Sequence, residues 1–115
     1  MHQTIETLCR EYRILYAEIW DTDSAARRTY GNRAHLPYQG LYRSLSGDAE
    51  QTDRLRQMLQ NGFQPYLTWR QGNMVALCFL RQKQLFCLFY CSETRGIESL
   101  SYARAVYDAF ILLSG

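Results

Sequence analysis

The residues best suited to molecular recognition lie between positions 27 and 43. This segment holds four arginines and three tyrosines and contains no acid. Guanidinium groups bind phosphates and tyrosine rings stack on bases, but the same two residue types are also enriched in protein–protein interfaces. The candidate partner-binding patch therefore consists of Arg27, Arg28, Arg33, His35, Tyr38, Tyr42 and Arg43.

The overall charge bears on which partner this patch would bind. The net charge at pH 7 is only +2, whereas a nucleic-acid-binding domain usually has a much stronger basic footprint. We therefore favour a protein partner and keep a nucleic-acid-binding module built on residues 27–43 as the alternative. A third interpretation stays open at this point: the segment is a structured loop whose tyrosines cover the core.

Residue types that support catalysis occur here without the partners that catalysis requires. Cys78 and Cys87 lie in apolar surroundings, which keep a thiol protonated and inert, and no base is placed beside Cys91. The Cys87/Cys91 pair lacks the second pair of a zinc site, and Asp21 and Asp23 alone supply too few oxygens for a divalent cation. No glycine-rich phosphate loop is present. We expect a protein that is not an enzyme and that uses no cofactor and no metal.

Length and composition are those of an ordinary globular protein. The chain has 115 residues, 47% of them hydrophobic, which is enough for a single domain spanning residues 1–115. Its longest apolar runs, of which Leu85 to Cys91 is one, are far shorter than the ~20 residues of a membrane span. We see no signal peptide and interpret all four cysteines as reduced thiols, so we expect a cytoplasmic protein with no membrane partner.

The first half of the chain predicts a helix, a hairpin and a second helix. Apolar spacing indicates a helix up to about Arg13 that Thr4 caps. Residues 14–20 have the composition of a strand, although their spacing also allows the helix to continue; residues 25–30 would form the partner strand. We expect a loop with a structured interior at 31–47. A second helix then begins after Asp48 and stops at Asn61-Gly62, with an apolar stripe of Leu55, Met58 and Leu59.

The second half predicts three strands and a last helix. A strand at 65–70 is followed by strands at 74–80 and 85–91, and a turn at Gln82-Lys83 would pair Leu80 with Leu85. Both faces of these last two strands are apolar, so they must be central and covered on both sides. A helix from about Ile97 to Leu113 supplies part of the cover, with a stripe of Leu100, Ala103, Val106, Tyr107, Phe110, Ile111 and Leu113. The predicted fold is an α/β (α+β), profilin-like three-layer α/β/α sandwich around a mainly antiparallel sheet of about five strands.

This order of elements resembles the Roadblock dynein light chain family, whose bacterial members are small stand-alone domains of this length. The local match is best in YLTWRQGNMVALCFLRQKQLFCLFY and the helix after it. The loop at Leu36-Pro37-Tyr38 is longer than the family's usual link, and the family's glycine- and aspartate-rich turns are only partly present. The resemblance implies a homodimer with a non-enzymatic, regulatory or scaffolding role and a small GTPase or another protein as partner.

The resemblance also implies where two copies would meet. The first strand of the triplet would pair with its twin, and the second helices would lie side by side. The candidate dimer interface is Leu55, Met58, Leu59, Tyr66, Thr68 and Arg70. An open edge strand is normally protected, and a twofold contact would protect this one. Cover by segment 31–47 is the alternative.

Overall fold

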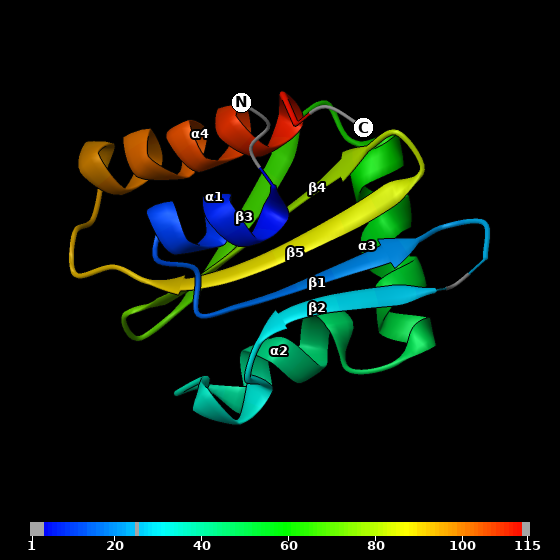
Figure 1. The fold of residues 1–115 in the computed structure, drawn as a ribbon, viewed down its shortest axis with the longest axis horizontal. Helices are drawn as coiled ribbons and strands as arrows, with labels where there is room; N and C mark the ends of the chain where they lie inside the picture. Colours follow the sequence, from blue (N-terminus) through cyan, green and yellow to red (C-terminus); the bar gives the residue numbers. More distant parts are fainter. Residues whose placement is uncertain (1–3, 25, 114–115) are drawn as a thin grey trace.

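The computed structural model describes residues 4–24 and 26–113, which form one five-stranded sheet covered by helices on both faces (Figure 1). In chain order the elements are α1 (Ile5–Glu11), β1 (Tyr16–Asp21), β2 (Arg27–Gly31), a 3₁₀ turn η1 (Arg33–His35), α2 (Gln39–Ser46), α3 (Ala49–Asn61), β3 (Tyr66–Gln71), β4 (Met74–Arg81), β5 (Gln84–Cys91) and α4 (Ile97–Ile111).

The sheet has the strand order β2-β1-β5-β4-β3, with every neighbouring pair antiparallel. The chain therefore builds two hairpins and joins them by placing β5 beside β1. The predicted β4–β5 register is confirmed, because Leu80 pairs with Leu85 and Cys78 with Cys87. β2 and β3 are the two edges of this sheet. Residues 16–21 form a strand, which settles the choice that the sequence left open at 14–20.

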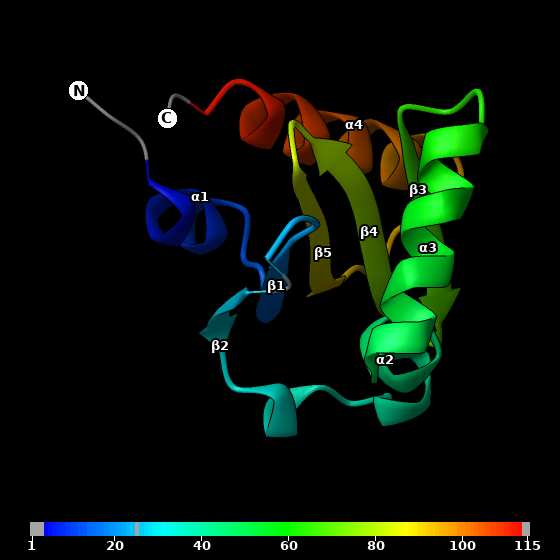
Figure 2. The same ribbon diagram turned by 90° about the vertical axis from the view of Figure 1, so that its right-hand side faces the viewer.

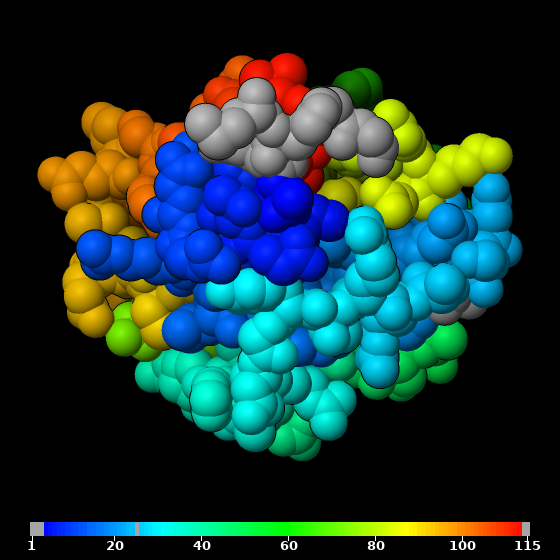
Figure 3. Space-filling view, in the orientation of Figure 1, coloured from blue at the N-terminus to red at the C-terminus, as the bar shows by residue number. Residues whose placement is uncertain are grey.

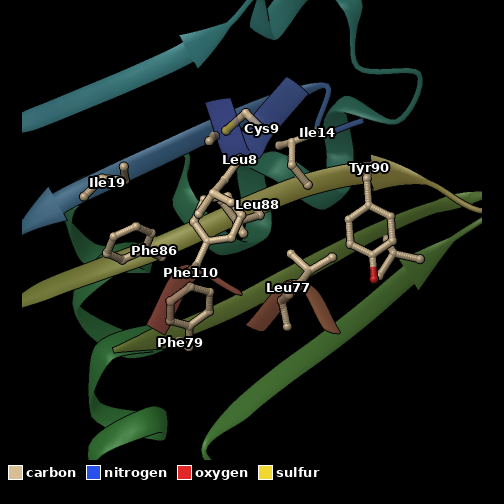
Figure 4. Packing of buried hydrophobic residues seen from close by; sticks show 13 residues of the cluster. Leu8, Cys9, Ile14, Ile19, Leu77, Phe79, Phe86, Leu88, Tyr90 and Phe110 are labelled. Carbon is tan, nitrogen blue, oxygen red and sulfur yellow. The ribbon is translucent and has the colours of Figure 1, made fainter. Parts of the chain in front are cut away.

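Helices cover the two faces in pairs, with α1 and α4 on one side of the sheet and α2 and α3 on the other (Figure 2). Alternate residues of β4 and β5 enter the two cores. Under α4, Phe79 stacks on Phe86 with ring centroids 5.0 Å apart, and Phe110 lies edge-on to both (Figure 4). Each fully buried ring of this size stabilises the fold by ~1.5–3 kcal/mol. The predicted three-layer sandwich is confirmed.

Segment 31–47 differs most from the prediction. It was expected to be a loop, but it contains η1 and the two-turn helix α2. No side chain caps the start of α2, and Gly40 lowers its helix propensity. The helix is instead stabilised by burial of Leu41, Tyr42 and Leu45 against the sheet. Tertiary packing therefore overrides weak local preference here.

The other helices follow their sequence signals closely. Thr4 accepts from the Thr7 amide and Asp48 from the Gln51 amide, so both predicted caps are present. α1 ends at Glu11, two residues before the expected limit. α3 ends at Asn61 as expected, but Gly62 is extended rather than left-handed. In α4, Ala103, Val106 and Phe110 are buried. Leu100 was expected in this stripe, but it is 61% exposed.

Candidate functional sites

A buried carboxylate lies at the centre of the β1–α2 interface. Glu18 is 0% exposed, on a strand whose other inward residues are apolar or aromatic. The groups that donate hydrogen bonds to its carboxylate are all neutral. Its Oε2 accepts from the hydroxyls of Tyr16 and Tyr42, each at 2.6 Å, and its Oε1 accepts from Ser46 Oγ at 2.7 Å and Trp20 Nε1 at 2.8 Å. Four hydrogen bonds thus compensate for burying the charge.

Two arginines lie over this cluster, each resting on an aromatic ring. The Arg27 guanidinium lies 5.3 Å from the centroid of the Trp20 ring, and its Nη1 is 3.7 Å from Glu18 Oε1. The Arg33 guanidinium lies 5.3 Å from the centroid of the Tyr42 ring and donates to the Tyr42 hydroxyl at 3.5 Å. Both cations therefore converge on Glu18, one directly and one through a tyrosine.

The electrostatics of the cluster keep its hydroxyls protonated. Burial raises the pKa of Tyr16, and the hydrogen bond to Glu18 raises it further. Burial and the Glu18 hydrogen bond also raise the pKa of Tyr42, while the hydrogen bond from Arg33 opposes them. Both tyrosines therefore stay donors to the carboxylate at neutral pH. The cluster is a fixed hydrogen-bonded unit and offers no free base for proton transfer.

An open hollow adjoins these arginines, beside the edge strand β2. Its volume is ≈ 720 Å³, and its lining residues are Tyr16, Arg27, Thr29, Gly31, Asn32, Arg33, Ala34 and Gln39. β2 (cyan) is exposed on the face of the molecule that Figure 3 shows. The loop after β2 is held locally, because Asn32 Oδ1 accepts from the Ala34 amide and Gln39 Nε2 donates to the carbonyl oxygens of Arg33 and Leu36.

The structure divides the patch that the sequence predicted at 27–43. Arg27 and Arg33 share the hollow. Arg28 alternates with Arg27 along β2 and therefore points to the opposite face of the sheet. Tyr42 is buried in the Glu18 cluster, so it cannot contact a partner. The rest of the predicted patch consists of His35 and Arg43, which are exposed, and Tyr38, which is half-buried.

Glu18 is the central residue that sequence reasoning missed. Its signal is a single charge inside the apolar strand ILYAEIW, with hydrogen-bond donors two residues away on each side, at Tyr16 and Trp20. Residues two apart on a strand share a face, so this spacing indicates a buried network. Ser46 and Tyr42, both on α2, complete the network, and no short-range sequence pattern predicts that they bind Glu18.

The second candidate surface is the outer edge of β3. A two-residue turn at Gly72-Asn73 places Gln71 opposite Met74. The two residues that flank such a turn bond each other through both backbone N–H groups, and from there hydrogen-bonded pairs alternate with non-bonded pairs along β3 and β4. Residues 66, 68 and 70 therefore direct their N–H and C=O groups away from β4. In the part of the chain that the structure describes, no strand and no segment of 31–47 pairs with them.

Exposed apolar side chains flank this edge. Phe63, in the α3–β3 connection, is fully exposed, and Met58 on α3 is 48% exposed. One flank of α3 faces β1 and β5, because it lines a cavity with residues of these strands through Thr52, Asp53 and Arg56. Met58 lies on the opposite flank of the helix, which therefore faces β3. On the other face, the exposed Leu100 shares a cavity with Thr68.

The predicted dimer-interface residues are not equally free to meet a second copy. Leu55 and Leu59 of the predicted interface are buried in the protein's own core. Tyr66 packs on Tyr107 with ring centroids 4.9 Å apart. Arg70 is also engaged internally: it donates to the carbonyl oxygens of Ser92 and Thr94 at 2.9 and 2.8 Å and to Ser99 Oγ. Met58 and Thr68 remain exposed.

The cysteines and the potential metal ligands are the remaining chemistry-bearing groups among residues 4–24 and 26–113. No group of three or more His, Cys, Asp or Glu side chains there is arranged to hold a metal ion. All four cysteines are free thiols, and only Cys91 is exposed. Burial raises the pKa of Cys9 to about 12 and that of Cys78 well above its ordinary value. None of the described helices is long and apolar enough to cross a membrane.

Two solved structures share the fold at low sequence identity. The chain matches Myxococcus xanthus MglB with a TM-score of 0.54 and 8% identity over 92% of this chain and 87% of that one. It matches MglC, also from Myxococcus xanthus, with a TM-score of 0.53 and 12% identity over 90% and 93% of the two chains. No family model and no curated protein matches the sequence. At these identities the likeness concerns the fold, and it confirms the Roadblock-like architecture expected from the sequence.

Proposed function

We propose that this protein is a homodimeric, non-enzymatic interaction module that regulates or scaffolds a protein partner, with a small GTPase as the partner class. The observation that carries the proposal is the open edge of β3, flanked by exposed apolar side chains. The Roadblock-like fold supports it, because the sequence resemblance to that family implies both the dimer and the partner class. We expect the protein to act in the cytoplasm.

The β3 edge has the properties of a pairing surface. Its outward N–H and C=O groups need partners, and proteins usually cover or break such edges. Here no proline or lysine occurs within β3, and Thr68 lies exposed in the middle of the strand. A second β3 strand, related by a twofold axis, would satisfy these groups and cover Met58, Phe63 and Leu100. The dimer would then have one continuous ten-stranded sheet.

A proline scan of the two sheet edges tests the dimer. Thr68→Pro removes one outward N–H of β3 without removing a bond to β4. Thr29→Pro is the matched control on the opposite edge. The backbone N–H of Asp21 donates to the carbonyl oxygen of Ala26, and hydrogen-bonded pairs alternate with non-bonded pairs along β1 and β2 from that point. The Glu18–Thr29 pair is therefore non-bonded, and Thr29 also points its N–H outward. Circular dichroism checks that both variants fold.

The readout is the mass in solution, measured by sedimentation over a dilution series. We expect a dimer for the wild type and for T29P. The T68P dimer should have a dissociation constant at least about tenfold higher, so that T68P becomes a monomer first on dilution. A monomeric wild type would refute the dimer. A folded T68P that dimerises like the wild type would refute the β3 interface, and loss of the dimer in T29P alone would place it at β2.

A further inference from the structure

We propose that the hollow beside β2 binds a phosphate group through Arg27 and Arg33, and that this group belongs to a small phosphorylated ligand. The inference concerns the edge of the sheet opposite β3, so it does not depend on the proposed dimer. It rests on the placement of the two guanidiniums, on their charge balance and on the size and lining of the hollow.

Both guanidiniums are held in place before any ligand arrives. Arg27 rests on the Trp20 ring and Arg33 on the Tyr42 ring, each with 5.3 Å between the guanidinium carbon and the ring centroid. The rings are themselves fixed, because Trp20 and Tyr42 both donate to Glu18. A binding site gains affinity when its groups need not be ordered on binding. Each guanidinium directs one nitrogen, Nη1, at the Glu18 cluster and keeps further N–H donors for an anion.

The charges in the site do not balance. Two cations face the single carboxylate of Glu18, and four neutral donors already bind that carboxylate at 2.6–2.8 Å. The contact of Arg27 with Glu18 is correspondingly long, at 3.7 Å. Among the described residues Arg33 forms no ion pair with an acid, and residues 24–47 contain no acid at all. The hollow therefore has an excess positive charge that an anion would neutralise.

The lining favours a phosphate over a carboxylate. Arg33 and Arg27 offer several N–H donors, the Thr29 hydroxyl lines the same hollow, and Asn32 accepts with its Oδ1, which leaves its amide nitrogen free to donate. A carboxylate has two oxygens to satisfy such a set, whereas a phosphate ester has three. The hollow is open to solvent, and its volume of ≈ 720 Å³ leaves room for more than one phosphate group. The geometry therefore fits a phosphate that is attached to a larger molecule.

Titration with phosphate probes tests this site. Trp20 lies directly under Arg27, so its fluorescence should change when pyrophosphate or guanosine diphosphate binds. Guanosine without phosphate and citrate are the comparison ligands. Arg33→Gln and Arg27→Gln should each weaken pyrophosphate binding at least about tenfold. Arg28→Gln removes the same charge from the same strand on the opposite face, and it should change the affinity by less than about twofold.

The outcomes separate the site from general surface charge. Absence of pyrophosphate and guanosine diphosphate binding at about 50 mM salt, where phosphate contacts are strongest, would overturn the proposal. An equal loss in R28Q and R33Q would also overturn it, as would citrate binding as tightly as pyrophosphate. Tighter binding of guanosine diphosphate than of pyrophosphate supports an ester-linked ligand, and equal binding supports recognition of the phosphate alone. Thermal melts show whether each variant folds. R33Q keeps the test valid if R27Q does not fold, because the exposed Arg33 makes no direct contact with Glu18.

Discussion

Replacing Glu18 measures how much the buried cluster contributes to the fold. In Glu18→Ala, the hydroxyls of Tyr16, Tyr42 and Ser46 lose their acceptor while they stay buried. The Trp20 indole keeps an alternative acceptor, Ser46 Oγ at 3.2 Å. An unsatisfied buried donor costs about 1–3 kcal/mol, so three of them cost about 3–9 kcal/mol. Because an ordinary domain has a total stability of only about 5–15 kcal/mol, we expect E18A to be largely unfolded.

Glu18→Gln is the more informative variant because it keeps the side-chain volume and one acceptor oxygen. The amide oxygen can still accept from Trp20 and Ser46, in neutral bonds worth about half as much as the charge-assisted ones. The amide NH2 cannot accept, so the Tyr16 and Tyr42 hydroxyls lose their acceptor. We expect a loss of about 2–4 kcal/mol in the free energy of unfolding. Urea denaturation at pH 7, followed by tryptophan fluorescence and circular dichroism, measures this value.

Glu50→Gln is the matched control for this substitution. Glu50 lies on α3 with its side chain 80% exposed, and among the described residues it forms an ion pair with Arg54 alone, four residues later. Exposed pairs of this kind contribute little, so E50Q should unfold at the same urea concentration as the wild type. If E18Q also unfolds there, the cluster has no structural role and the reasoning is wrong. A cycle with Tyr42→Phe adds a second check, because residues in one network should show non-additive losses.

Two further predictions concern the titratable groups. At pH 8 a thiol reagent such as dithionitrobenzoate should label only Cys91 in the native protein, because Cys9, Cys78 and Cys87 are buried. In denaturant it should label all four cysteines. Rapid labelling of a second thiol in the native protein would contradict this packing. Burial raises the pKa of Cys9 from 9.0 to about 12, with a smaller contribution from Glu6, and burial raises that of Tyr90 from 10.0 to about 12. Both folded-state pKa values lie above the unfolded ones, so the free energy of unfolding should stay at its maximum below about pH 9 and should fall as pH rises toward 12. For each group the fall should be about 1.4 kcal/mol per pH unit between its unfolded and folded pKa values. A flat profile in urea melts between about pH 9 and 11 would contradict the burial of these groups.

The central hairpin was predictable because its pattern is local. Residues 74–91 alternate between two apolar faces with a short polar turn between them, and this period fixes both the register and the need for cover on each side. The start of α3 was predictable for the same reason, since Asp48 needs only the amide three residues later. Such signals depend on backbone geometry within a few residues, so they survive without knowledge of the rest of the chain.

α2 and the Glu18 cluster were not predictable in this way. α2 has a glycine at its second position and no side-chain cap, so its helical state depends on the apolar surface that the sheet presents to Leu41 and Leu45. The partners of Glu18 come from positions two, 24 and 28 residues away. Residue types alone place Arg28 and Arg33 in one basic segment, whereas the pleat of β2 puts Arg28 on the other face.

By itself the sequence determined the class of fold, the central β-hairpin and the helix caps, since each depends on spacing along the chain. The tertiary structure decided which members of each predicted set face solvent. It buried Leu55, Leu59 and Tyr42, and it left Thr68 exposed on β3 and Met58 exposed on α3. It also brought Arg27 and Arg33 together over Glu18. The physical reason is that exposure and charge balance are properties of neighbours in space, and here those neighbours lie on strands and helices far apart in the chain.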